Sequence, residues 1–263
     1  MIHLLVLIGL ILILSLTFVL FNLTLQLIVF LGSFVGFIVI AFVLTVIVLN
    51  FVVMVIEKDK YSDVQRWKFI MWLVNWATPL LTFSKTEVEG LEKLDETRVA
   101  RGVIYANHQS IVDVFSIVKS VKRRHAYIAK KEIGNIFLLS RAMRMIDCGF
   151  LDRQNPRAAV KTITEAVKVV KRGILMVIFP EGTREILAPM DTFKAGSFKV
   201  ALKAQADIIP MTIYNSYEVI RRWPLPTTVR IKIHDPIPYD AYKDMETREI
   251  ASMVEAIVKQ DLL

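Results

Sequence analysis

The chain has 263 residues, of which 54% are hydrophobic, and a formal net charge of +8. Its mean hydropathy of +0.49 is too high for an ordinary soluble domain, so the composition indicates a membrane-associated protein. Nucleic acid, a membrane surface or a phosphorylated substrate would each fit the basic charge, and the hydropathy favours the last two. The single Cys148 excludes an intrachain disulfide and suits a reducing compartment.

The first part of the chain, residues 1–56, contains no Asp, Glu, Lys or Arg and is predicted to be a hydrophobic membrane anchor. One helix of that length would far exceed a hydrocarbon core of about 30 Å. We therefore expect two helices, over 2–21 and 27–50, with a break in the more polar stretch 22–26. A cleaved signal peptide is the alternative, but the run lacks a basic start and a small-residue cleavage site.

The second part, residues 57–83, combines basic residues with three of the four tryptophans. Its cations come directly after the apolar run, so by the positive-inside rule this end of the anchor faces the cytoplasm. Phe69, Trp72 and Trp76 recur at spacings of three and four, which places aromatic rings on one helical face. The pattern fits an interfacial helix with its rings at headgroup level, and it also fits a core helix of the following domain.

The third part, residues 84–263, alternates short apolar runs with helical patterns. This alternation predicts a single α/β domain with a largely parallel or mixed sheet flanked by helices. The predicted strands cover 86–90, 102–106, 125–129, 147–151, 174–179, 208–214 and 228–233. The predicted helices cover 110–120, 132–145, 156–172, 195–204 and 245–260. The clearest helix has Asn155 as its cap, Pro156 at its first position and Gly173 after its end.

Polar residues follow four of the predicted strands, at 107–108, 130–131, 152–153 and 179–184. Ligands of α/β sheets bind outside the carboxyl ends of the strands, so these residues are expected to converge on one crevice. A His, an Asp, a Glu and several cations gathered there would suit general-base attack by a phosphate-bearing acceptor. Taken singly, the lysines also fit solvated surface, and Pro180 to Thr183 also fit a turn.

His108 and Asp113 are the most informative pair in this set. Residues five positions apart cannot face each other within one regular element. They can meet only if the chain turns between them, with His108 in the loop and Asp113 in the first helical turn. Ser110 and Asp113 also fit a plain helix start, with a serine cap and an acid that suits the helix dipole. That alternative accounts for Asp113 and leaves His108 unexplained.

Four blocks within residues 107–211 resemble those of the glycerolipid acyltransferases, specifically the 1-acyl-sn-glycerol-3-phosphate acyltransferases. Residues 107–113 resemble the family's NHxxxxD block, and residues 179–184 match its FPEGTR block at every position. Residues 149–153 and 209–211 resemble its second and fourth blocks. Glu185 stands where the family often has Ser, and Met211 is a looser fit in the fourth block. These departures leave the preference for acceptor and chain length open and remove no group that the chemistry needs.

The resemblance implies transfer of a fatty acyl group from an acyl thioester to the 2-hydroxyl of lysophosphatidic acid, giving phosphatidic acid. His108 would be the general base, oriented by Asp113. The implied substrate-binding residues are Arg153 and Arg184 for the phosphate, Lys130 as a further phosphate candidate, and Glu181, Gly182 and Thr183 in the loop. The resemblance implies no metal and no cofactor, because acyl-CoA or acyl-carrier protein serves as the donor substrate.

Two alternatives stay open. The same chemistry could act on glycerol-3-phosphate or another lysophospholipid, or the scaffold could be a non-catalytic lipid-binding membrane protein. Intact His108, Asp113 and Glu181 speak against the second, because a binder needs no base. The expected partners are lysophosphatidic acid, the acyl donor and membrane lipids. No nucleic acid is expected, because no patch interleaves aromatic residues with cations. The expected location is the cell membrane, with the catalytic domain facing the cytoplasm.

Overall fold

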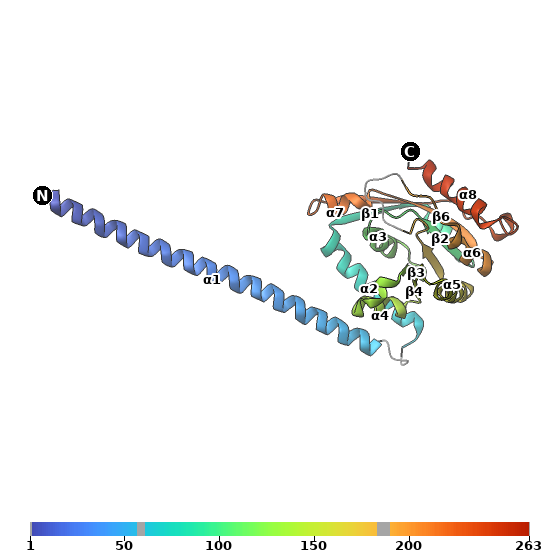
Figure 1. Cartoon of the computed structure of the whole chain (residues 1–263), viewed down its shortest axis with the longest axis horizontal. Helices are drawn as coiled ribbons and strands as arrows, with labels where there is room; N and C mark the ends of the chain where they lie inside the picture. Colours follow the sequence, from blue (N-terminus) through green and yellow to red (C-terminus); the bar gives the residue numbers. More distant parts are fainter. Residues whose placement is uncertain (1, 57–60, 183–189, 263) are drawn as a thin grey trace. The chain divides into compact units, whose positions relative to one another are not determined.

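The structure is a computed structural model of the chain and describes residues 2–56, 61–182 and 190–262 (Figure 1). It divides into two compact units, Met1–Val55 and Ile56–Leu263. Each unit is described by itself.

The first unit is formed by one continuous helix, α1 (Ile2–Ile56), which differs from the predicted pair of helices. By length and composition it could cross a membrane, since Ile8–Ile56 has a mean hydropathy of 3.1. The stretch 22–26 contains no Gly or Pro, and Thr24 Oγ1 donates to the carbonyl of Leu20 at 2.8 Å, so nothing local interrupts the helix. At 1.5 Å per residue α1 is roughly 80 Å long, against about 30 Å for a hydrocarbon core.

The second unit contains a seven-stranded sheet in the order β1-β7-β6-β2-β5-β3-β4. The strands are β1 (Ser84–Glu89), β2 (Gly102–Ala106), β3 (His125–Lys130), β4 (Gly149–Leu151), β5 (Leu175–Ile178), β6 (Asp207–Tyr214) and β7 (Thr227–Ile233). Every neighbouring pair is parallel except β6 and β7. The prediction of a largely parallel or mixed sheet is confirmed, and each of the seven predicted strands is present.

The helices of the second unit follow the predicted pattern with two refinements. They are α2 (Asp63–Thr82), α3 (Val112–Ser120), α4 (Phe137–Met145), α5 (Pro156–Lys171), α6 (Lys199–Ala204), α7 (Ser216–Arg221) and α8 (Thr247–Gln260), with short 3₁₀ helices η1 (Leu91–Leu94), η2 (Lys131–Asn135), η3 (Ala195–Phe198) and η4 (Tyr239–Ala241). The predicted helices 132–145 and 195–204 each divide into a 3₁₀ turn and an α-helix, and α7 was not predicted. The predicted cap of α5 is confirmed, because Asn155 Oδ1 accepts from Ala158 N at 3.1 Å.

The helices cover both faces of the sheet. The crossovers through α3 and α4 run one way across the strand order, and those through α5 and α6 run the other way. Because such crossovers are right-handed, α3 and α4 lie on one face and α5 and α6 on the opposite face. α2 packs against α3 and α4, and α5 packs against α6 (Figure 1). β2 and β5 are buried along their whole length as a result.

α2 supports both interpretations of its sequence. Ile70 and Met71 are buried, with exposed fractions of 4% and 6%, so one face of the helix belongs to the core. Trp72 and Trp76 are 62% and 57% exposed, so the other face presents aromatic rings to the surroundings. The helix is therefore a core element that carries an exposed aromatic face.

Strand register brings the predicted site together. Tyr105 at the end of β2 pairs with Ile178 at the end of β5. The residues that follow β2, from Asn107 to Asp113, therefore lie beside the residues that follow β5, from Phe179 to Gly182. This neighbourhood is the candidate site.

Candidate active site

The site starts in the turn that leaves β2, where His108 and Asp113 meet. The distance between His108 Nδ1 and Asp113 Oδ2 is 2.7 Å. The same Oδ2 atom accepts the backbone amides of Gln109 and Ser110 at 2.8 and 2.9 Å, which folds the intervening turn around the carboxylate. Asp113 lies in the first turn of α3 and is fully buried. The structure thus makes the turn that the five-residue spacing required.

The helix-start alternative accounts for less of this geometry. Ile111, the residue that caps α3, makes no side-chain capping bond. Ser110 Oγ accepts from Val112 N at 3.2 Å. The Asp113 carboxylate serves the turn and the imidazole instead of the first helical amides.

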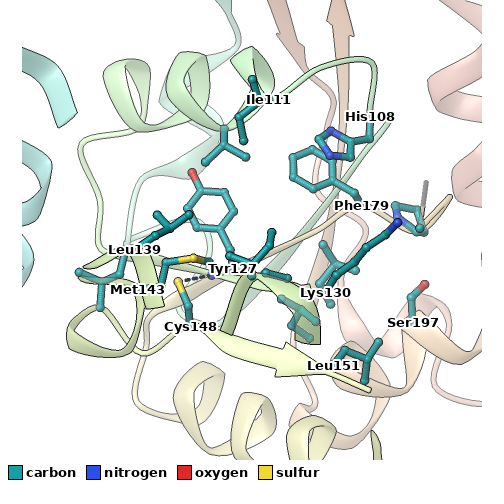
Figure 2. A pocket seen from close by; sticks show the side chains of 18 of the residues that line it. His108, Ile111, Tyr127, Lys130, Leu139, Met143, Cys148, Leu151, Phe179 and Ser197 are labelled. Carbon is teal, nitrogen blue, oxygen red and sulfur yellow. Dashed lines mark hydrogen bonds between the residues drawn. The ribbon is translucent and has the colours of Figure 1, made fainter. Parts of the chain in front are cut away.

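The imidazole of His108 is oriented from two sides. Because a carboxylate only accepts hydrogen bonds, the contact with Asp113 places a proton on Nδ1 and leaves the lone pair on Nε2. The ring stacks on Phe179, with centroids 4.0 Å apart and planes 18° apart (Figure 2). His108 lines the cavity described below. Its Nε2 is the atom of this pair that can accept a proton.

Glu181 lies behind the histidine and is only 1% exposed. Its Oε1 accepts from His108 N at 2.6 Å, and its Oε2 accepts from Asp191 N at 3.1 Å. Burial raises the pKa of this carboxyl to about 7, against the lowering effect of the two amide bonds. Glu181 therefore joins the β2 turn to the chain around Asp191, which is the contact pattern of a positioning residue.

Asn107 fixes the other side of the turn. Its Nδ2 donates to the Ile213 carbonyl at 2.9 Å, and its Oδ1 accepts from Ile213 N at 2.8 Å. Since Ile213 belongs to β6, this pair of bonds locks the exit of β2 to its neighbouring strand. The backbone that carries His108 is thus held on both flanks.

Three cations, Lys130, Arg153 and Lys194, line the same cavity as His108. None of the three forms an ion pair with a carboxylate of the residues that the structure describes. Lys131 differs, because its Nζ lies 3.0 Å from Asp152 Oδ2. Of the two adjacent lysines, Lys130 therefore lines the cavity, whereas Lys131 forms an ion pair.

Gly182 makes room for Arg153. Arg153 Nη1 donates to the Gly182 carbonyl at 2.9 Å. Gly182 has a φ of 78°, and a Cβ there would lie 2.2 Å from Arg153 Nη1. A side chain at this position would displace the guanidinium. Thr183 and Arg184, also predicted for the site, lie outside the described residues.

The cavity has a volume of about 960 Å³ and two chemically different ends. His108, Lys130 and Ser197 lie towards one end, and Tyr127, Leu139 and Met143 towards the other (Figure 2). α2, α3, α4, β3 and β4 contribute most of its apolar wall. A volume of this size is typical of a pocket for a small organic ligand.

Cys148 lies in the apolar wall as a buried free thiol. Its Sγ accepts from Tyr127 N at 3.2 Å, and burial raises its pKa to about 12. The thiol therefore stays protonated at neutral pH, which agrees with its interpretation as a small apolar residue. Within the described ranges, no group of three His, Cys, Asp or Glu side chains is arranged to hold a metal ion.

Comparison with known proteins shows which family the chain resembles. A family model described as Acyltransferase matches residues 85–214. The crystal structure of a 1-acyl-sn-glycerophosphate (LPA) acyltransferase from Thermotoga maritima superposes with a TM-score of 0.65 and 27% identity, over 81% of this chain and 85% of that chain. The chain carries an acyltransferase domain.

Two relatives support the assignment. A 1-acyl-sn-glycerol-3-phosphate acyltransferase from Cocos nucifera is 27% identical over 231 residues, which is 81% of this chain and 69% of the relative. A chloroplastic 1-acyl-sn-glycerol-3-phosphate acyltransferase from Arabidopsis thaliana is 31% identical over 186 residues, or 66% of this chain. The match spans 50% of the length of the Arabidopsis relative.

Two residues of the candidate site were not among the predicted site residues. Lys194 reaches the cavity because its backbone N donates to the Pro180 carbonyl at 3.1 Å, which holds it beside the end of β5. Phe179 was part of the third block, and its stacking on His108 could not be inferred from spacing. Both contacts join segments far apart in sequence, and no local pattern marks either of them.

Proposed function

We propose that this acyltransferase transfers a fatty acyl group from an acyl thioester to the 2-hydroxyl of lysophosphatidic acid, giving phosphatidic acid. The observation that carries the proposal is the His108–Asp113 pair at the cationic end of a cavity with an apolar far end. Lysophosphatidic acid offers a phosphate to the cations, and an acyl thioester offers a chain to the apolar wall. The names of the relatives point to the same acceptor.

In the proposed mechanism, His108 Nε2 takes the proton of the 2-hydroxyl as its oxygen attacks the thioester carbonyl. Asp113 holds the Nδ1 proton and stabilises the imidazolium that forms. A carbon–oxygen bond forms, the carbon–sulfur bond breaks, and the imidazolium returns its proton to the departing thiolate. A thiol with a pKa of about 8.5 leaves readily, so no covalent enzyme intermediate is needed.

Lys130, Arg153 and Lys194 are the proposed phosphate-binding residues of the described chain, joined by Arg184. No carboxylate of the described residues forms an ion pair with Lys130, Arg153 or Lys194, so a phosphate would supply the missing counter-charge. One guanidinium nitrogen of Arg153 donates to the Gly182 carbonyl, and this bond orients the remaining N–H donors of the guanidinium. Glu181 and Gly182 shape the loop in this proposal.

An acceptor panel tests the function. We expect the enzyme to acylate lysophosphatidic acid with a kcat/KM at least about tenfold above that for monoacylglycerol, which lacks the phosphate, or glycerol-3-phosphate, which lacks the acyl chain. Lys130→Met should raise KM for lysophosphatidic acid about tenfold with little change in kcat, because it removes a binding charge. Lys131→Met is the matched control and should behave as wild type. A preference for glycerol-3-phosphate, or equal effects of the two lysine variants, would contradict the proposal.

We propose that the apolar end of the cavity holds the acyl chain of the donor. Met143→Trp should shift the preference towards shorter donors by more than tenfold, since two excluded methylenes lose about 1.6 kcal/mol. Competition between donors of graded chain length measures the shift. Phe137→Trp is the control: Phe137 lies on the same helix and is 61% exposed. An unchanged chain-length profile in Met143→Trp would place the acyl chain elsewhere.

The proposed location is the cell membrane, with the catalytic domain on the cytoplasmic side. α1 supplies the apolar anchor, and cations follow it in the sequence. The exposed Trp72 and Trp76 suit the headgroup region, where amphipathic rings are favoured. Lysophosphatidic acid would then enter from the membrane and the acyl thioester from the aqueous phase.

A further inference from the structure

A group of exposed cations lies outside the site, on two neighbouring helices. Arg157 and Lys161 lie one turn apart on α5, and Lys199 and Lys203 lie one turn apart on α6. All four are exposed, and none forms an ion pair with a carboxylate of the described residues. α5 and α6 pack against each other (Figure 1). We call these four residues the α5–α6 cationic surface.

Several other surface cations are neutralised locally. Lys168, further along α5, lies 2.8 Å from Glu165. Lys243 lies 3.0 Å from Asp240, and Lys232 lies 2.7 Å from Asp261. Unpaired charges in one area produce a field that attracts an anionic partner.

The α5–α6 cationic surface borders the cavity. α5 begins after β4, at the carboxyl edge of the sheet, and contributes Ala159 and Ile163 to the cavity wall. The turn before α6 contributes Lys194 and Ser197 to the same cavity. A partner bound to this surface would therefore stand beside the cavity.

The surface lies on the face of the sheet opposite to α2 and α4. Three large exposed aromatic side chains, Trp72, Trp76 and Phe137, belong to those two helices, whereas the exposed apolar side chain of α5 is the smaller Val160. A membrane-binding surface combines cations with such rings on the same side. Separation of the two features onto opposite faces favours a soluble anionic partner for α5 and α6.

We propose that the α5–α6 cationic surface docks an acidic carrier protein that holds the acyl chain as a thioester on a flexible arm. The inference rests on the proposed function, because the reaction needs an acyl thioester from the aqueous phase. A carrier can bind outside the cavity while its arm delivers the chain inside. Cations repeated along two helices, about 6 Å apart on each and about 9 Å between axes, match the acidic side chains of a protein surface.

Charge reversal tests the docking surface. The full-length double variant Arg157→Glu/Lys199→Glu, held in lipid nanodiscs, is compared with wild type using palmitoyl-carrier protein and palmitoyl-CoA. We expect KM for the carrier to rise at least about tenfold at about 0.05 M salt. The values of kcat and of KM for palmitoyl-CoA and lysophosphatidic acid should stay within about twofold of wild type. The difference should shrink at about 0.5 M salt, because exposed charges are screened.

The control carries the same change of charge at the amino end of the central strand β2. Arg98 and Arg101 are exposed and precede β2, so Arg98→Glu/Arg101→Glu should leave every kinetic constant near wild type. Thermal unfolding checks that both variants fold. Fluorescence anisotropy of labelled palmitoyl-carrier protein measures docking directly, so the surface is tested even where no transfer occurs.

Three results for the charge-reversal variant would overturn the proposed docking surface. The first is an unchanged affinity for the carrier. The second is an equal rise of KM for palmitoyl-CoA, which would indicate a site for nucleotide phosphates, and the third is a selective loss of binding to anionic vesicles, which would indicate a membrane-binding surface. Use of palmitoyl-CoA by wild type without any use or binding of the carrier would also overturn it and leave the proposed function standing. Transfer to lysophosphatidic acid from neither donor would instead refute the proposed function.

Discussion

Replacing His108 with Ala should lower kcat for acyl transfer to lysophosphatidic acid about 10³-fold, because a positioned general base contributes roughly 10² to 10⁴. Alanine lacks Nε2, which is the atom of the His108–Asp113 pair that can accept the proton of the hydroxyl. KM for lysophosphatidic acid should change little, since the proposed phosphate-binding cations are separate residues. Steady-state kinetics with a saturating thioester donor measures both constants.

Asp113→Asn tests how much the orientation of His108 contributes to the rate, because it keeps the proposed base and changes its partner. The neutral amide keeps the size of the side chain but stabilises the imidazolium poorly, so kcat should fall at least about a hundredfold. Asp113 also accepts two backbone amides, so thermal unfolding must be measured alongside. An activity of His108→Ala within tenfold of wild type, with the fold intact, would remove His108 from the role of base.

Local sequence patterns predicted the parts of the fold whose causes are local. The apolar runs found the strands, and the Asn155-Pro156 pair with Gly173 found the ends of α5. The five-residue spacing of His108 and Asp113 predicted the turn between them, because only one backbone path lets them meet. The spacing thus predicted how His108 and Asp113 meet, whereas the role of His108 as general base came from the resemblance and stays a prediction.

Contacts between distant segments were not predicted, because their causes are not local in the sequence. Glu181 holds amides 73 positions upstream and 10 positions downstream, and no periodicity records such a pairing. Lys194 depends on a backbone bond to Pro180. α1 differs from the predicted pair of helices because that prediction used membrane thickness, whereas a stretch without Gly or Pro gives the helix no local reason to break.

Glu181→Gln should lower kcat about 10²-fold with a smaller change in KM, because a misplacement of about 1 Å at a catalytic group costs that much. The wild-type carboxylate accepts amides through both oxygens. Glutamine has one accepting oxygen, and its amino group would face a backbone N–H. Either the His108 or the Asp191 contact must then be lost. The backbone that carries the base would shift while the base itself stays.

Glu255→Gln is the matched control for this positioning role. The Glu255 carboxylate accepts the Phe193 amide at 2.8 Å, close to Asp191 in sequence, and so holds the same stretch of chain from a different element, α8. Its replacement should change kcat by no more than about threefold. Equal losses of kcat in the two variants would mean that Glu181 acts only by holding the chain around residues 191–193.

The pH dependence of stability gives a second test of Glu181. Its native pKa of about 7 lies above the usual 4.5, so between these values the native state binds a proton more tightly than the unfolded chain does. The contribution of this group to the free energy of unfolding is therefore present at low pH and is lost as the pH rises through that window. Urea unfolding between these pH values should show the decline in wild type and a weaker decline in Glu181→Gln. An identical pH profile in the variant would contradict a raised pKa of the buried Glu181 carboxyl.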